Sequence, residues 1–352
     1  VQHYHLIVST FTIALGADII LRPIMSVTFY ILLASALIFD FLNGFHDSSN
    51  IVATVIASRA MKPRAVLWST AVAHFIGPFL FGVAVAKTIG EGLVNPAHIS
   101  MAAVIATLIS AIVWNLITWW LGIPSSSSHA LVGGIIGSIF AGSGLGAIQS
   151  EGLIKVLVSL FASPVVGLIA GYLLMNLTLF IFRGATPGIN RFFKRGQILT
   201  SIGLALSHGA NDAQKTMGII TLGLIVEGAI SDFTVPTWVI AVSAGAIALG
   251  TATGGWSLIK TLGARIYKIR PVHGFVSQIT GASVILTAAL IGGPVSTTQV
   301  MSSAIMGVGS AERVSKVRWQ VGYQMLIAWA LTVPVTALIA GLVYYPLNSL
   351  MT

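Results

Sequence analysis

NGFHDSSN at residues 43–50 interrupts a long apolar run with two asparagines, a histidine and an aspartate, and SHGANDAQK at residues 207–215 interrupts a second run in a similar way. The two stretches align as GFHDSS and GANDAQ, which pairs Asp47 with Asp212, 165 residues later. An unusual polar break that recurs in both halves of a chain indicates an internal duplication.

Two further motifs support the duplication. PSSSSHALVGGIIG (124–137) aligns with PVSTTQVMSSAIMG (294–307), and PVVGLIAG (164–171) aligns with PVTALIAG (334–341), each at a distance of 170 residues. Each half therefore contains a polar break, then a proline followed by hydroxyl residues, then a second proline. The preserved order predicts two structural repeats.

The composition is that of a membrane protein. Of the 352 residues, 56% are apolar and only 8% are charged, whereas soluble domains have about 25% charged residues. The net charge of +9 comes from bases that lie mostly between the apolar runs, so it does not indicate a nucleic-acid partner. Long rather than alternating apolar runs, the first of them at 5–21, predict an all-α protein with about ten segments in the plasma membrane.

Charge predicts that the repeats are inverted. The loop at 312–322 carries three bases, whereas its repeat partner at 142–152 carries none, and the loops at 59–64 and 257–269 also have base-poor partners. Because bases gather on the cytoplasmic side, partner loops should lie on opposite sides of the membrane. The predicted organisation is an N-terminal segment with an additional helix at 1–26, a first repeat at 27–182, a cytoplasmic linker at 183–196 and an inverted second repeat at 197–352.

Inverted repeats are typical of secondary transporters. We expect helices that are broken at residues 43–50 and 207–215, and half-helices or re-entrant hairpins that start at the proline and hydroxyl clusters. The sequence contains no nucleotide-binding motif and no cysteine, so we predict no cofactor and transport driven by an ion gradient.

The hydroxyl clusters predict an anion site. Proline at a helix start frees the first N–H groups, and serine or threonine adds hydroxyl donors. Such N-termini bind anions through these donors and the helix dipole; the alternative is ordinary capping and packing between helices. The candidate anion ligands are Ser125, Ser126, Ser127, Ser128, Ser296, Thr297, Thr298 and Lys215.

The polar breaks predict a coupling-ion site. A carboxylate at the bilayer centre costs at least about 2.5 kcal/mol, so it normally faces a partner or a cavity. Oxygen-rich groups suit sodium or a proton carried on an aspartate; the alternative is a neutral aspartate that a neighbouring helix satisfies. The candidate residues are Asn43, His46, Asp47, Asn50, Asn211, Asp212 and Gln299.

Lys215 stands where the first repeat has Asn50. It can pair with an acid, meet the anion or snorkel to the membrane interface. His129 and His208 either relay protons or are simply hydrogen-bonded between packed helices. Asp18 and Asp40 have no acidic repeat partner and receive no role.

The motifs resemble those of a known family. NGFHDSSNIVAT and SHGANDAQKTMG resemble the paired signatures of the inorganic phosphate transporter (PiT) family, and PSSSSHALVG and PVSTTQ resemble its hydroxyl-rich helix starts. The resemblance covers about residues 27–346. It implies an inverted-repeat fold with inorganic phosphate and coupling ions at its centre, commonly as a homodimer.

HDSSN together with NDAQK resembles the bacterial low-affinity branch of that family. The resemblance implies proton-coupled uptake, including uptake of neutral metal–phosphate complexes. Sodium-coupled branches carry asparagine where Lys215 stands, and many members carry histidine where Gln299 stands.

The leading hypothesis is a secondary active symporter, not an enzyme, that imports phosphate with protons by alternating access. A sodium-coupled symporter and an anion channel are the alternatives. An intramembrane serine hydrolase that uses His129 and Asp47 is disfavoured, because four adjacent serines mark no single nucleophile and the second repeat lacks the histidine. The residues alone do not separate phosphate from sulfate.

Overall fold

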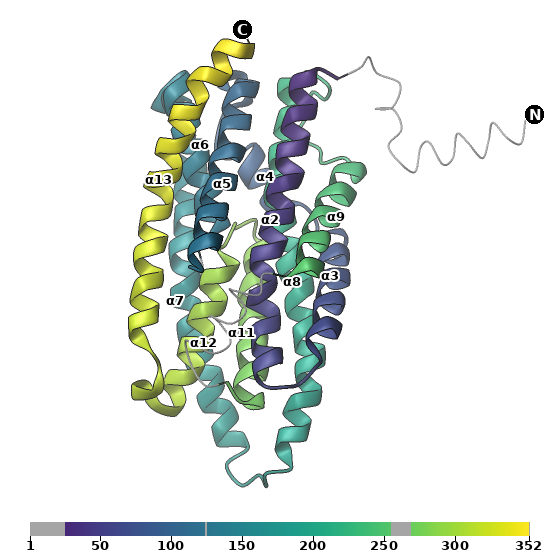
Figure 1. Ribbon diagram of the computed structural model, residues 1–352, viewed down its shortest axis with the longest axis vertical. Coiled ribbons are helices and arrows are strands. Elements are labelled where there is room, and N and C mark those ends of the chain that lie inside the picture. The colour runs from purple at the N-terminus through teal and green to yellow at the C-terminus, as the bar shows by residue number, and fades with distance from the viewer. Residues whose placement is uncertain (1–24, 124, 255–268, 352) are drawn as a thin grey trace, which may run out of the picture.

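The computed structural model describes residues 25–123, 125–254 and 269–351, and its regular elements there are helices (Figure 1). The apolar run at 5–21, Asp18 and most of the loop at 257–269 lie outside the described residues. The first half contains α2 (Val27–Ala57), α3 (Pro63–Leu80), α4 (Ala84–Gly90), α5 (Met101–Leu121), α6 (Ser127–Ser143) and α7 (Ser150–Ile181). The second half contains α8 (Ile189–Val226), α9 (Thr237–Thr253), α11 (Pro271–Leu290), α12 (Thr297–Arg313) and α13 (Trp319–Met351).

Five of these helices, α2, α5, α7, α11 and α13, are long and apolar enough to cross a membrane. A sixth candidate is the pair α3 and α4, which is bent by 78° at residues 81–83. Within residues 25–123, 125–254 and 269–351 these candidates are fewer than the roughly ten segments predicted for the whole chain. α6, α9 and α12 have only 17 residues each, and the 38-residue α8 is not among the apolar candidates. Exposed Phe180 and Leu173 on α7 and Leu342 on α13 present apolar surface outward, as a lipid-facing protein requires.

Helices of one half pack on helices of the other half in matching pairs. α6 packs on α13 as α12 packs on α7, and α2 packs on α9 as α3 packs on α8. In Figure 1, α5 and α6 occupy the upper part of the molecule and α11 and α12 the lower part, while α2 begins at the top and α8 at the bottom. The equivalent hairpins α5–α6 and α11–α12 therefore lie at opposite ends of the molecule, and the equivalent helices α2 and α8 start from opposite ends (Figure 1).

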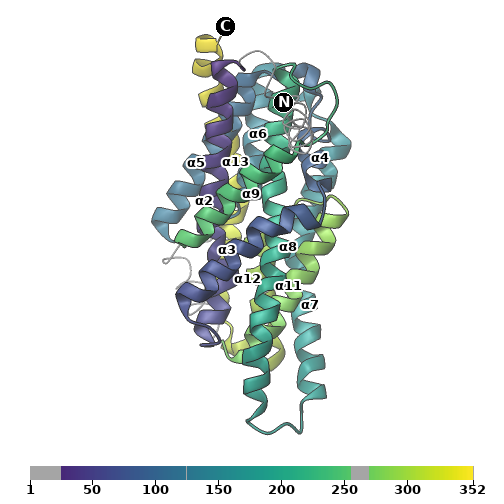
Figure 2. The same ribbon diagram turned by 90° about the vertical axis from the view of Figure 1, so that its right-hand side faces the viewer.

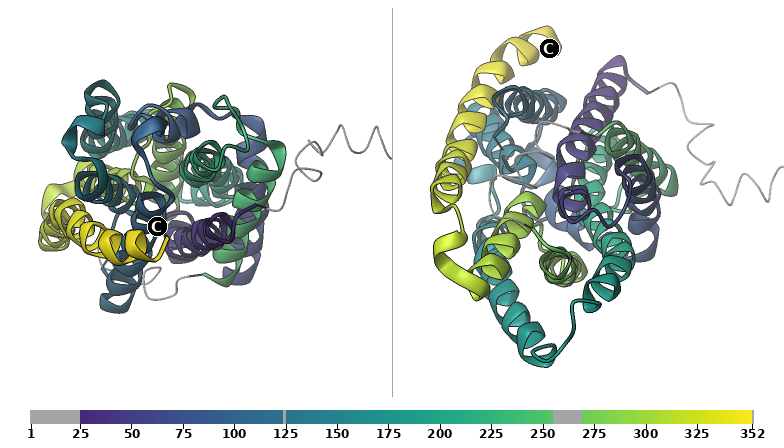
Figure 3. Two further views of the ribbon diagram at one scale, coloured as in Figure 1. Left: turned by 90° about the horizontal axis from the view of Figure 1, so that it is seen from above. Right: turned by 60° about the horizontal axis from the view of Figure 1, so that its bottom comes forward.

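The halves thus interleave rather than form two separate domains. Figure 2 shows α3 and α9 lying against α8 on one side of the molecule. Seen from above, α13 lies on one side of the molecule and α9 on the other (Figure 3).

The predicted breaks at residues 43–50 and 207–215 are wrong, because α2 and α8 run through them without interruption. The glycines in these motifs permit close packing instead. A Cβ on Gly44 would lie 2.1 Å from the backbone oxygen of Ile247, and one on Gly209 would lie 2.5 Å from that of His74. Among the described residues, the sharply bent helix pair is α3–α4, inside a run that the sequence presents as continuous.

The link predicted at residues 183–196 is shorter in the structure. α7 ends at Ile181 and α8 already begins at Ile189, so residues 189–196 extend a helix. Phe193 anchors this extension, because its ring is buried and packs edge-on against Phe182 and Phe275. The division of the chain at this link stays a prediction.

Candidate anion and coupling-ion site

The two helix starts predicted from the proline and hydroxyl clusters are present. α6 begins at Ser127 and α12 at Thr297, each after an extended capping serine. The side chain of Ser126 accepts a hydrogen bond from the backbone N–H of His129 at 3.1 Å, and Ser296 accepts from that of Gln299 at 3.3 Å. Ser126 and Ser296 therefore cap their helices, and the residues that follow face the interior.

Four helices bring the polar motifs together. Thr298 of α12 donates to Asp47 Oδ1 of α2 at 2.7 Å, and Lys215 of α8 donates to Ser128 Oγ of α6 at 2.6 Å. These contacts join motifs that are up to 251 residues apart in the chain. The predicted anion ligands and the predicted coupling-ion ligands thus share one buried site.

The contacts on the two sides of the site are equivalent by the repeat. Asn50 donates to Asp47 Oδ1 at 2.8 Å and to Thr298 Oγ1 at 3.1 Å. Lys215 donates in the same way to Asp212 Oδ1 and to Ser128. The asymmetry is one of charge, because a neutral amide on one side becomes an ammonium on the other.

Thr297 lies between the two acids. Its hydroxyl oxygen is 3.2 Å from Asp47 Oδ2 and 3.1 Å from Asp212 Oδ2. A hydroxyl has one hydrogen, so it can donate to only one of these carboxylates at a time. Both acids are buried, with 4% and 0% of their surface exposed, so they are neighbours in a site shielded from water.

Lys215 is buried, with 1% of its surface exposed, so its ammonium does not snorkel to the interface. It donates to the backbone oxygen of Val295 at 3.0 Å, besides Asp212 and Ser128. These contacts use all three ammonium donors. The lysine therefore ties α8 to the start of α6 and to the connection that precedes α12.

The remaining predicted anion ligands divide into two groups. Ser127 donates to Asn43 Oδ1 at 2.7 Å, and Ser128 donates to the backbone oxygen of Val295 at 2.9 Å, so both line the site. Ser125 instead lies 2.8 Å from the hydroxyl of Thr118 in α5. This contact draws Ser125 toward α5.

The remaining coupling-ion candidates do not all reach the acids. Asn211 holds backbone, because its amide donates to Gly293 O at 3.3 Å and its oxygen accepts from Val295 N at 3.4 Å. Gln299 Nε2 lies 3.4 Å from Nδ1 of His129. His46 is buried and interacts with the backbone at Asn115.

His208 is closer to the acids than the sequence indicates. Its Nδ1 lies 3.1 Å from Asp212 Oδ2, and its Nε2 lies 3.9 Å from Asp47 Oδ2. Ligand atoms of His208, Asp47 and Asp212 all lie within 4.8 Å of one another. The ring stacks on His74 of α3, with centroids 4.9 Å apart.

Two polar residues near the site, His74 and Gln214, were not identified from the sequence, and a third, Asp40, received no role there. His74 is buried and lies 2.7 Å from the hydroxyl of Thr251, although the lone histidine in AVAHFIG was a visible signal. Gln214 accepts from the backbone N–H of Val85 at 2.7 Å, which attaches α4 to the second polar motif. Asp40 is buried and accepts a hydrogen bond from the hydroxyl of Thr216 at 2.6 Å, and Thr216 directly follows Lys215 in α8.

Comparisons with known proteins give the family of the chain. Residues 43–340 match the model of the phosphate transporter family. A protein of Bacillus subtilis (strain 168) described as "Probable low-affinity inorganic phosphate transporter" is 44% identical over 317 residues, which are 89% of this chain and 95% of that protein. A protein of Rhizobium meliloti (strain 1021) with the same description is 42% identical over 316 residues, again 89% and 95% of the two chains.

A solved structure described as "The sodium-dependent phosphate transporter" shares the fold, with a TM-score of 0.83 and 24% identity over 92% of this chain and 99% of that one. Together with the apolar helices, these findings make the chain a multi-pass membrane protein and a transporter rather than an enzyme. Since the family model spans most of the sequence and curated relatives match over most of their own length, the chain belongs to the phosphate transporter family.

Proposed function

We propose that the chain is a secondary active symporter that imports inorganic phosphate together with protons. The observation that carries the proposal is the position of Thr297, a residue of the anion-type helix start whose hydroxyl lies within hydrogen-bond distance of both buried acids. An anion bound at the two helix starts and a cation bound at the acids would be direct neighbours. Each would then improve the binding of the other, which is the basis of coupled transport.

The charges of the site favour a coupling cation. Asp47 and Asp212 carry two negative charges when both are ionised, and Lys215 supplies one positive charge. An uncompensated charge in a buried site costs several kcal/mol. One proton or one monovalent cation would balance the remaining negative charge. Without phosphate, the site would therefore favour binding of that cation before phosphate or together with it.

Lys215 favours a proton over sodium. Its ammonium contacts Asp212 and Ser128, whereas the equivalent position on the other side presents a neutral amide. A sodium ion about 4 Å from a fixed ammonium would be repelled by about 4 kcal/mol at an effective dielectric constant of 20. A proton shared among Asp47, Asp212 and His208 would avoid that repulsion.

The arrangement of the two hairpins supports alternating access. α5–α6 and α11–α12 approach the site from opposite ends, and the starts of α6 and α12 meet there. This arrangement supports inverted repeats that rock around a fixed central site. Opening one hairpin would expose the site to one side, while the other hairpin keeps the second side closed.

Uptake of radiolabelled phosphate into proteoliposomes tests the function. We expect accumulation when the outside is more acidic than the inside, with or without sodium on either side. Accumulation that requires a sodium gradient would instead establish the sodium-coupled alternative. Equilibration without accumulation under either gradient would establish a channel, and preferential uptake of sulfate would reassign the anion.

A further inference from the structure

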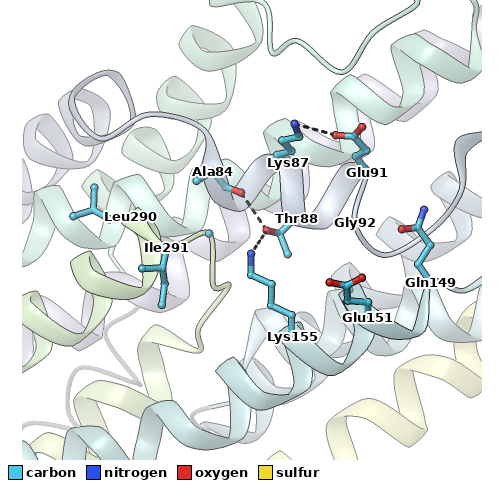
Figure 4. A pocket seen from close by; sticks show the side chains of 12 residues that line it. Ala84, Lys87, Thr88, Glu91, Gly92, Gln149, Glu151, Lys155, Leu290 and Ile291 are labelled. Carbon is cyan, nitrogen blue, oxygen red and sulfur yellow. Dashed lines mark hydrogen bonds and ion pairs between the residues drawn. The ribbon is translucent and has the colours of Figure 1, made fainter.

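A cavity of about 630 Å³ lies outside the site, between α4, the first turns of α7 and the end of α11 (Figure 4). Lys87, Thr88 and Glu91 line it from α4, and Glu151 and Lys155 line it from α7. Gly292, in the connection between α11 and α12, is part of its lining. The cavity therefore combines two cationic and two anionic side chains with one buried hydroxyl, that of Thr88.

The two bases that line this cavity lie away from the other bases that the structure describes. Apart from buried Lys215, the other described bases lie near the end of α2, the α7–α8 link, the start of α11 and the end of α12, which Figure 1 shows at the bottom of the molecule. Lys87 and Lys155 are the two exceptions among the described residues, and both line this one cavity. The positive-inside rule predicts that the basic end is cytoplasmic, so the cavity belongs to the outer half.

Of the two bases, Lys155 is the one whose charge is not paired with a carboxylate among the described residues. The ammonium of Lys87 lies 3.7 Å from the Glu91 carboxylate, which partly neutralises it. Lys155 instead donates to the neutral hydroxyl of Thr88 at 3.4 Å and forms no ion pair with a described carboxylate. Figure 4 shows its side chain reaching across the cavity from α7 toward α4.

The cavity and the central site share a wall. Gly292 has a φ of +72°, and a Cβ there would lie 3.0 Å from the backbone oxygen of Ala84, so the α11–α12 connection packs closely on α4. The next residue, Gly293, accepts the amide of Asn211, and Val295 accepts both Lys215 and Ser128. Residues 291–296 therefore separate the cavity from the central site.

We propose that this cavity is the outer vestibule of the transporter, in which Lys155 captures inorganic phosphate before it passes the connection at residues 291–296. The inference rests on the proposed phosphate uptake and adds a location and a residue to it. The exposed position of Lys155 makes phosphate binding there weak, because exposed charges are screened by salt. Lys155 thus governs arrival at the central site and not the transport cycle after binding.

Charge removal tests the role of Lys155. In proteoliposomes, Lys155→Gln should lower kcat/KM for phosphate by about three- to tenfold, within the range of electrostatic steering, while kcat at saturating phosphate stays unchanged. The kcat/KM of the wild type should fall with added salt more steeply than that of the variant. Lys62→Gln removes one exposed charge at the opposite end and should leave kcat/KM for inward transport unchanged.

Because the chain contains no cysteine, Lys155→Cys introduces a single thiol. An impermeant cationic methanethiosulfonate added outside should restore kcat/KM, an anionic one should lower it further, and inorganic phosphate should slow both reactions. Equal effects of the two reagents, or no labelling from outside, would overturn the vestibule. If the wild type transports no phosphate at all, the proposed function fails instead, and the two failures are thereby distinguished.

Discussion

Lys215 and Asn50 occupy equivalent positions but carry different charges. Each donates to an aspartate of its own helix and to a hydroxyl at a helix start, Ser128 for the lysine and Thr298 for the asparagine. A single residue therefore breaks the symmetry of a site built from two copies of one motif. We propose that this difference in charge selects the coupling ion.

Replacing Lys215 should change the coupling ion. Lys215→Asn leaves Asp212 without its cation, and the repeat-equivalent asparagine offers an oxygen ligand in its place. We expect proton-driven uptake to fall at least about tenfold, the loss that follows from one hydrogen bond to a charged group, and sodium to stimulate the remainder. Uptake under separate sodium and proton gradients measures both effects. Wild-type behaviour of Lys215→Asn would remove the lysine from the coupling scheme.

Asp47 should be essential for coupling but not for folding. Asp47→Asn keeps an acceptor for Thr298 and Asn50 and removes a charge that is costly to bury. We expect gradient-driven accumulation to be abolished while the purified variant unfolds at or above the wild-type temperature. Accumulation at the wild-type rate by the folded variant would contradict the role of Asp47.

The helix start of α12 combines a capping residue and a site residue in adjacent positions. Thr297→Ala removes a donor to a desolvated anion, so phosphate affinity should fall roughly tenfold or more. Ser296→Ala removes the cap on Gln299 and should cost about 1 kcal/mol of stability, with less effect on affinity. Phosphate binding by calorimetry and thermal unfolding in detergent separate the two effects; equal affinity losses would show that capping alone matters.

Helix packing at the polar motif of α8 can be tested with two glycines of the same helix. A Cβ on Gly209 would collide with the backbone of His74, whereas one on Gly203 meets nothing within 4 Å. Gly209→Ala should therefore destabilise the protein by about 1–3 kcal/mol through overpacking, and Gly203→Ala should stabilise it by up to about 1 kcal/mol through helix propensity. Thermal unfolding in detergent measures both, and similar shifts would contradict the close α3–α8 contact.

At the level of elements, the sequence predicts best what is encoded locally. The starts of α6 and α12 follow from a proline and a hydroxyl cap that lie side by side in the chain. A glycine in a polar motif is compatible both with a helix break and with a close contact between helices. Which of the two occurs depends on the partner helix: for Gly44, the backbone of Ile247 lies so close that a side chain would not fit. Likewise, the bonds of Asn211 to the α11–α12 connection depend on residues more than 80 positions away.

On the scale of the whole molecule, each half supplies what the other lacks. α6 of the first half packs on α13 of the second, and α12 packs on α7, so each half covers helices of the other half. The central site likewise needs both polar motifs and both helix starts. A homodimer, which the family resemblance implies, stays a prediction for this chain.

The orientation of the repeats gives the last prediction. The loop between α2 and α3 and the loop between α8 and α9 are equivalent by the repeat, yet the first is basic and the second carries Glu227 and Asp232. Since bases stay on the cytoplasmic side, Lys62→Cys should react with an impermeant thiol reagent only after cells are opened. Ser231→Cys should react on intact cells, and both side chains are exposed in the structure, so burial does not limit either reaction. The cysteine-free wild type supplies the background. Labelling of both variants from the same side would contradict the inverted repeat, and with it the rocking motion around the shared site.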